Sequence, residues 1–160
     1  MIGEKYVLLA DDDVHLAHLT LGAFADLETA VKIVLVSDGT EALDYLYKRG
    51  KYEDRPDDNP AVVLLDVKMP KVDGLEVLQQ VKGDARLKVT PIVMLTSSRD
   101  ERDILRSYQL GANAYVVKPA HFPEFIDVVK RLVLFWAQIN EPPPIVAPLP
   151  TASPAGTLRI

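Results

Sequence analysis

The sequence predicts an α/β protein built on one parallel β-sheet. Short apolar runs alternate five times with segments in which apolar residues recur at helical spacing. The central run, Ala61–Leu65, is almost wholly Val and Leu, as expected when helices cover both faces of a strand. Alternation of this kind favours parallel strands joined by right-handed helical crossovers.

The expected strands are short and rich in Val, Leu and Ile. Tyr6–Ala10 runs directly into three acidic residues, and Lys32–Val36 is rich in β-branched residues, which favour strands. In chain order we expect strands at Tyr6–Ala10, Lys32–Val36, Ala61–Leu65, Pro91–Leu95 and Tyr115–Val117.

The expected helices lie between and after these strands. Gly111 is typical of a residue that ends a helix, and Pro123 is typical of the first turn of one. A polar loop, Arg49–Pro60, precedes the third strand and contains two prolines and three aspartates. We expect helices at Val14–Leu27, Thr40–Lys48, Gly74–Val81, Arg99–Leu110 and Pro123–Ile139.

Length and composition limit the classes of function. The 160 residues suit one domain, residues 1–140, followed by a proline-rich segment, 141–160, that we expect to be extended or disordered. A net charge of −5 without a basic run disfavours nonspecific binding to nucleic acid or to a membrane. The chain has no cysteine, which excludes disulfides and thiolate chemistry. With no signal-peptide pattern and no apolar stretch long enough to span a bilayer, we expect a cytoplasmic protein.

Polar side chains stand where four of the expected strands end. Asp11 and Asp12 follow the first strand, Asp66 the third, Thr96 the fourth and Lys118 the fifth. Ligand sites of open α/β sheets lie beyond the carboxyl ends of the strands, so these groups should meet at one edge. Because crowded carboxylates repel one another, the cluster predicts a bound cation.

Phosphoryl transfer to a carboxylate requires a set of this kind. Asp66 would be the nucleophile, as carboxylates are in enzymes that form aspartyl-phosphates. Asp11 and Asp12 would hold Mg²⁺, a hard cation that binds through few carboxylates. Lys118 and Thr96 would bind the phosphoryl oxygens.

These residues resemble the receiver domain of two-component response regulators over about Lys5 to Gln138. The motifs that carry the resemblance are Asp11-Asp12, Asp66, Lys68-Met69-Pro70-x-x-Asp73-Gly74, Thr96-Ser97 and Lys118-Pro119. The resemblance implies a flavodoxin-like doubly wound (βα)5 three-layer sandwich, with a parallel five-stranded sheet in the order 2-1-3-4-5. It also implies that Asp66 is phosphorylated, and that Asp66 and the backbone carbonyl of Lys68 join Asp11 and Asp12 as ligands of the Mg²⁺ site.

The resemblance further implies a switch that acts through protein–protein contacts. A sensor histidine kinase would phosphorylate Asp66, and Thr96 and Tyr115 would then move inward. The protein would be a phosphoacceptor and not an enzyme, beyond self-phosphorylation and auto-dephosphorylation. Because little chain follows Ile139, we expect no DNA-binding module.

Finer features are similar to the single-domain receivers that partner phytochrome-type histidine kinases. They are the long loop Arg49–Pro60, the segment Lys82-Gly83-Asp84-Ala85-Arg86-Leu87 and the ending Leu134-Phe135-Trp136 of the last helix. Asp13 adds a third acid where the family varies.

The last expected helix is apolar over more than one face. Phe125, Val129 and Phe135 belong to one stripe, but Ile126, Val133 and Leu134 extend it around the helix. This excess favours a homodimer through Phe135 and Trp136. The alternative is that the proline-rich segment folds back over this surface.

Three other functions fit the sequence less well. A phosphatase of the haloacid-dehalogenase type would need an acid two residues after the nucleophile, where this chain has Lys68. A nucleotide- or flavin-binding module would need a glycine-rich phosphate loop after the first strand, and neither common form occurs. A receiver-like interaction scaffold that has lost phosphorylation conflicts with the intact acid set.

Several polar residues have simpler explanations than chemistry. Asp13 and Asp38 are typical of turns and helix caps. His15 and His18 lie three residues apart on a helix but have no third metal ligand nearby in the sequence, so we expect structural or surface roles. His121 is expected on a surface loop.

Overall fold

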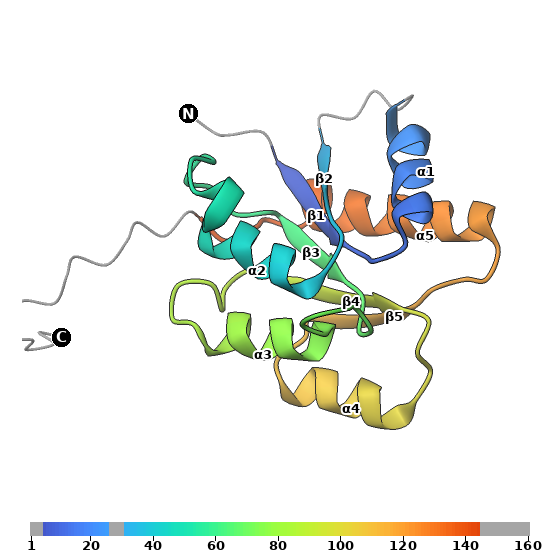
Figure 1. Ribbon diagram of the computed structural model, residues 1–160. Helices are drawn as coiled ribbons and strands as arrows, with labels where there is room; N and C mark the ends of the chain where they lie inside the picture. The colour runs from blue at the N-terminus through green and yellow to red at the C-terminus, as the bar shows by residue number, and fades with distance from the viewer. Residues whose placement is uncertain (1–4, 26–30, 145–160) are drawn as a thin grey trace, which may run out of the picture.

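The computed structural model describes residues 5–25 and 31–144, and it confirms the expected α/β architecture (Figure 1). All strand pairs are parallel, and the sheet order is β2-β1-β3-β4-β5, as the resemblance implied. The strands are β1 Tyr6–Ala10, β2 Lys32–Val36, β3 Val62–Leu65, β4 Ile92–Thr96 and β5 Ala114–Val117.

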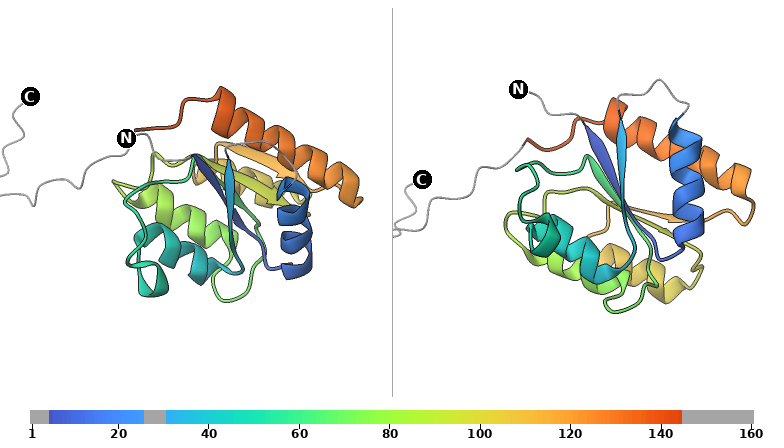
Figure 2. Two further views of the ribbon diagram at one scale, coloured as in Figure 1. Left: turned by 90° about the horizontal axis from the view of Figure 1, so that it is seen from above. Right: turned by 45° about the horizontal axis from the view of Figure 1, so that its top comes forward.

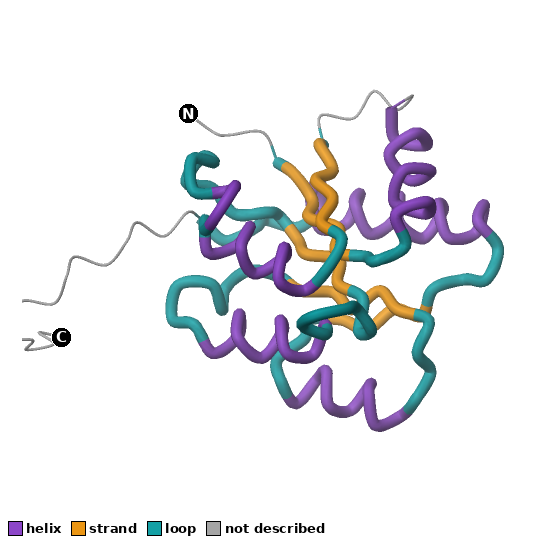
Figure 3. Tube along the Cα trace, in the orientation of Figure 1, coloured by secondary structure: helices purple, strands orange, loops and turns teal. Residues whose placement is uncertain are grey.

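Helices cover both faces of the sheet and complete three layers (Figures 1 and 2). One face carries α1 and α5, and the other carries α2, α3 and α4. Figure 3 shows the strands enclosed between these helices. The helices are α1 Val14–Ala25, α2 Gly39–Tyr47, α3 Gly74–Gly83, α4 Glu101–Gln109 and α5 Phe122–Val133.

Successive residues of each inner strand enter opposite halves of the core. In β1, Leu8 packs with the α2 and α3 side, whereas Val7 and Leu9 pack with the α1 and α5 side. β3 is fully buried in the same way, with each of its residues at most 1 % exposed. These strands are therefore apolar without interruption, because neither face of the sheet meets water.

Three differences from the sequence predictions are instructive. The last helix does not continue as an α-helix to Ile139, because α5 ends at Val133 and a π-helical stretch, Leu134–Ile139, follows. The polar loop contains a 3-10 turn, Gly50–Tyr52. In α1, Leu19 shares the helical spacing of Leu16 and Phe24, which favours burial, but it is exposed. Thr20 is buried instead, since its hydroxyl donates to the Leu16 carbonyl at 2.7 Å.

The interpretation of Asp13 and Asp38 as capping residues is confirmed. Asp13 accepts a hydrogen bond from the Leu16 N–H at 3.0 Å, and Asp38 accepts one from the Glu41 N–H at 2.7 Å. His15, His18 and His121 are exposed, as expected. The expected end of the first helix at Leu27 and most of the proline-rich segment lie outside the described residues.

No helix within the described ranges is both long enough and apolar enough to cross a membrane.

Candidate functional site

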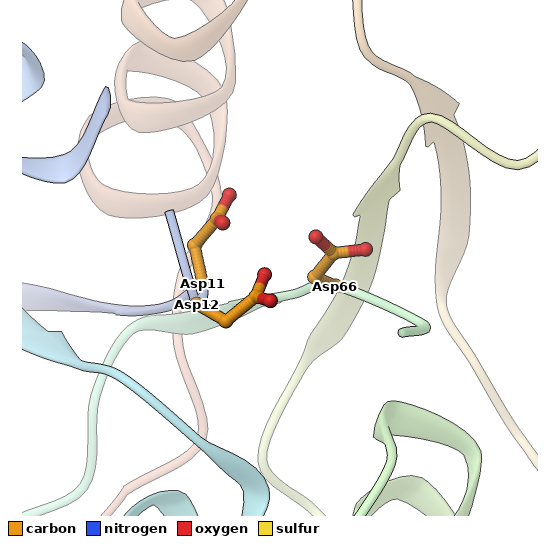
Figure 4. Close-up of side chains that lie close together, drawn as sticks. All are labelled: Asp11, Asp12 and Asp66. Atoms are coloured by element: carbon orange, nitrogen blue, oxygen red, sulfur yellow. The ribbon is translucent and has the colours of Figure 1, made fainter. Parts of the chain in front are cut away.

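Neighbouring strands β1 and β3 bring three carboxylates together. Ala10 pairs with Leu65, so the residues that follow them, Asp11 and Asp66, leave the sheet side by side. Carboxylate oxygens of Asp11, Asp12 and Asp66 all lie within 4.8 Å of one another (Figure 4). Asp11 and Asp66 are buried and Asp12 is exposed, so one side of the cluster is open to solvent.

Lys118, the residue after β5, supplies the positive charge in this cluster. Its Nζ donates to Asp11 Oδ2 at 2.5 Å and to Asp66 Oδ2 at 2.9 Å. The sheet order explains this contact, because β4 and β5 continue the same edge and the Lys118 N–H donates to the Thr96 carbonyl. Two acids that are 55 residues apart in the chain thus share one ammonium group.

The electrostatics of the site follow from burial and from this pairing. Burial raises the pKa of Asp11, although its contacts with Lys118 oppose the rise. Burial would lower the pKa of Lys118, but hydrogen bonds and charge from Asp11 and Asp66 outweigh it and raise that pKa. Lys118 is therefore held in its charged form.

The donor set fits a hard divalent cation. Three carboxylates face a single ammonium group, so an excess of negative charge remains at the open side. Carboxylate oxygens are the ligands that Mg²⁺ prefers, and exposed Asp12 leaves room for water on the ion. The Lys68 N–H lies 3.4 Å from Asp66 Oδ1, which brings the backbone of Lys68 to the same place. That the Lys68 carbonyl is a ligand stays a prediction.

The β3–α3 loop is held against Asp66 by Asp73 and Gly74. Asp73 caps α3 by accepting from the Glu76 N–H at 2.9 Å. A Cβ at Gly74 would lie 1.9 Å from the Asp66 carbonyl oxygen, so only glycine allows this approach. The Gly74 N–H also donates to the Val67 carbonyl at 2.7 Å, and this hydrogen bond joins the end of the loop to its beginning.

Thr96 and Tyr115 are joined through Ser98. Thr96 is buried at the end of β4, and its Oγ1 accepts from the Ser98 N–H at 3.3 Å. The Tyr115 hydroxyl donates to the Ser98 carbonyl at 2.9 Å. Ser98 Oγ donates to Asp103 Oδ2 at 2.6 Å, which connects this loop to α4. Sequence reasoning missed Ser98, because its partners lie on separate elements and leave no local pattern.

Most of the expected site residues lie at one edge of the sheet, whereas Tyr115 lies within β5 and pairs with Met94. Lys118 contacts Asp11 and Asp66, and Asp12 lies in the same cluster of carboxylates. Thr96 is the last residue of the adjacent strand, β4. In the described part of the chain, no other group of three or more acidic or histidine side chains is placed to hold a metal ion. The histidines therefore do not form a second site there.

The comparison with known families matches residues 7–130 to the response regulator receiver domain. The chain belongs to this family. The match spans the sheet and most of α5, and it includes all of the site residues named above.

The related proteins include receivers of phytochrome systems. The response regulator Rcp1 of Synechocystis is 32 % identical over 134 residues, which cover 84 % of this chain and 90 % of the Rcp1 chain. The Mn²⁺-bound structure of Rcp1 matches this structure with a TM-score of 0.80. A phosphorylated cyanobacterial phytochrome response regulator, RcpA, is 35 % identical, with a TM-score of 0.82 and coverage of 89 % and 100 %. The bacteriophytochrome response regulator AtBRR is 52 % identical, with a TM-score of 0.68 and coverage of 88 % and 100 %. The chain is thus a receiver related to phytochrome response regulators.

Proposed function

We propose that this protein accepts a phosphoryl group on Asp66 from a phosphohistidine of a sensor histidine kinase. The observation that carries the proposal is the meeting of three carboxylates and a buried lysine at the carboxyl ends of neighbouring strands. The Mn²⁺-bound structure of Rcp1 and the phosphorylated structure of RcpA support the metal and the modification, respectively.

In the reaction, a carboxylate oxygen of Asp66 attacks phosphorus while the bond from phosphorus to the histidine nitrogen breaks. The electron pair of that bond leaves with the imidazole. A bound Mg²⁺ would neutralise charge on the incoming phosphoryl group and its acceptor. Asp11, Asp12, Asp66 and the Lys68 carbonyl would hold it. Lys118 exchanges its contact with Asp66 for a contact with a phosphoryl oxygen, and the Thr96 hydroxyl donates to another phosphoryl oxygen.

The same step would release the Ser98 loop. If Thr96 Oγ1 turns toward the phosphoryl group, the Ser98 N–H loses its acceptor, and the Tyr115 contact to the Ser98 carbonyl is weakened. The consequence is a change in the surface formed by α4, β5 and α5. Leu105 and Tyr108 of α4 are already exposed there, so an apolar surface is available to a partner.

The donor kinase would approach beside α1. An open hollow of about 460 Å³ is lined by residues that include Leu16, Lys118 and Phe122, and it adjoins the acid cluster. Val14, in the first turn of α1, is 53 % exposed. We infer a phytochrome-type kinase in the cytoplasm as the donor, on the strength of the RcpA and AtBRR likeness.

Phosphotransfer profiling tests this function. Sensor kinases, phytochrome-type ones included, are autophosphorylated with labelled ATP and mixed with the protein and Mg²⁺. The protein should take up label in seconds from its partner, and Asp66→Asn should take up none. Asp13→Asn is the matched control, because it removes an exposed acid next to the cluster and should label normally. Equal labelling of wild type and Asp66→Asn would refute the site.

We propose a switch rather than an enzyme with an external substrate. The position two residues after Asp66 is Lys68, so the general acid of haloacid-dehalogenase phosphatases is missing. Steady-state turnover of small phosphoesters should therefore be absent. Sustained turnover that is lost in Asp66→Asn would instead establish the phosphatase.

We also propose that the domain 1–140 forms a homodimer through its last helical segment. Leu134, Phe135 and Ile139 are 48 %, 47 % and 63 % exposed. Ile126 and Val133, expected to widen the outer apolar surface, are instead buried in the core, and Trp136 is half-buried against it. The outer surface is therefore smaller than the sequence suggested, and Phe135 is its main aromatic residue.

A further inference from the structure

We infer that Gly39, at the N-terminus of α2, is a positioning residue for the metal site. This rests on the proposed function, because it concerns the same Mg²⁺ site. Gly39 is 27 residues before Asp66 and does not belong to the acid cluster. It acts on the site through the β3–α3 loop, which lies beside the N-terminal end of α2 (Figure 2).

The contact between Gly39 and this loop leaves no space for a side chain. A Cβ at Gly39 would lie 1.8 Å from the carbonyl oxygen of Val72 and 2.6 Å from its carbonyl carbon. These are backbone atoms, so no change of rotamer can relieve the overlap. Gly39 itself is buried. Any larger residue must push Val72, and the loop with it, away from α2.

Two further contacts fix the loop to the same end of α2. Asp38 caps the helix and its Oδ2 lies 3.4 Å from Lys71 Nζ. Lys71 has a φ of 68°, a left-handed conformation that costs a non-glycine residue on the order of 1 kcal/mol. Val72 packs against the core beside α2 and α3. The surroundings thus impose a conformation that the loop alone would not prefer.

Movement of Val72 would reach the metal site because the loop is short and fixed at both ends. The loop begins at Asp66, directly after β3, and ends at Gly74, the first residue of α3. Gly74 packs against the Asp66 carbonyl. The Val72 N–H donates to the Pro70 carbonyl at 2.9 Å, and the Lys68 N–H faces Asp66. Displacing Val72 therefore displaces the backbone around Lys68, the proposed carbonyl ligand. Mg²⁺ tolerates little departure from octahedral geometry.

Titration calorimetry of the full chain with Mg²⁺ tests this role. Gly39→Ala should weaken Mg²⁺ binding by about tenfold, as loss of outer-shell support for metal ligands does. Gly22→Ala and Gly83→Ala are the controls, because a Cβ at either position meets no atom within 4 Å. Both should bind Mg²⁺ as the wild type does. Melting in EDTA shows how much each substitution affects the fold alone.

The outcomes separate this inference from the proposed function. If the wild type does not bind Mg²⁺, the proposed metal site fails. If the wild type binds but Gly39→Ala binds equally well, only the role of Gly39 fails. If Gly39→Ala does not fold, Val72→Ala decides, since it removes the loop's packing without adding a clash. It should weaken Mg²⁺ binding about threefold, and unchanged binding would overturn the inference.

Discussion

At the scale of single residues, the site without metal depends on Lys118. Its ammonium group is the charge that two buried carboxylates share, and its side chain is only 10 % exposed. Removing it would leave Asp11 and Asp66 without a cationic partner among the described residues. Buried carboxylates in that state are strongly destabilising.

We therefore expect Lys118→Gln to lower the free energy of unfolding in EDTA by about 2–4 kcal/mol. Mg²⁺ should recover part of this loss, because it replaces the missing charge. Urea unfolding with and without Mg²⁺ measures both effects. Lys68→Gln is the control, since Lys68 is exposed. Equal stability of Lys118→Gln and wild type in EDTA would contradict the role of Lys118.

Asp66→Asn should have the opposite effect on the protein without metal. The substitution removes one of three crowded carboxylates, while Lys118 keeps its contact with Asp11. We expect the free energy of unfolding in EDTA to rise by about 1 kcal/mol, because like-charge repulsion decreases. Calorimetric melting checks this. A melting temperature at or below that of wild type would count against charge crowding.

The meeting of Asp11, Asp66, Thr96 and Lys118 was predictable because each stands at or directly after the end of a strand. A buried strand gives a recognisable apolar run, and parallel topology then decides where the next polar residue lies. Gly39 and Ser98 were not predictable in this way. Their importance comes from backbone approach and from partners on other elements, which no local pattern records.

At the scale of elements, Glu41 joins α2 to its neighbours. Its carboxylate accepts from the Ser37 N–H at 3.0 Å and from the Tyr52 hydroxyl at 2.6 Å, and it pairs with Lys51 at 3.1 Å. Burial alone would raise its pKa, but these hydrogen bonds outweigh burial and lower the pKa to about 2. The charged form of Glu41 is therefore favoured in the folded state.

Glu41→Gln should destabilise the protein in a pH-dependent way. A carboxyl whose pKa is lower in the folded state stabilises above its unfolded pKa, near 4.5, and loses that effect as pH falls toward 2. We expect a loss of about 2 kcal/mol at pH 7 that shrinks steadily below pH 4.5. Urea unfolding across this range measures it. A difference between the two proteins that does not change with pH would contradict the assignment.

The loop between α2 and β3 contains a buried arginine that the sequence did not predict. Its prolines and aspartates indicated a polar loop, but Arg55 within it has a side chain only 8 % exposed. The Arg55 Nε donates to the Tyr45 carbonyl at 2.6 Å. The Arg55 guanidinium also lies over the Tyr45 ring, with its Cζ 4.4 Å from the ring centroid. It also pairs with Asp58 at 3.2 Å. A charged residue in a polar sequence gives no sign that it is buried, so only the folded chain reveals this anchor.

At the scale of the whole molecule, the sequence predicted the fold, but it does not predict the oligomeric state. Alternating strands and helices predicted the layers, and the resemblance supplied the strand order. Oligomeric state depends on what remains exposed after folding. The last helix illustrates this difference, since part of its apolar surface turned out to be core.

We expect the proposed dimer to depend on Phe135. Phe135→Ala should shift the protein toward monomer in sedimentation, because it removes an exposed aromatic from the outer surface of the last helix. Trp136→Ala should also shift it, but with a lower melting temperature, because Trp136 packs partly against the core. Leu105→Ala, on exposed α4, is the control for a general loss of apolar surface. A dimer unaffected by Phe135→Ala would exclude this interface.

Intact-mass measurement after treatment with an acyl phosphate tests the central claim most directly. With Mg²⁺, the wild type should gain the mass of one phosphoryl group, and digestion should place it on Asp66. EDTA or Asp66→Asn should prevent the gain. If the folded, Mg²⁺-loaded protein stays unmodified, or if Asp66→Asn is modified to the same extent, the account of this site is wrong.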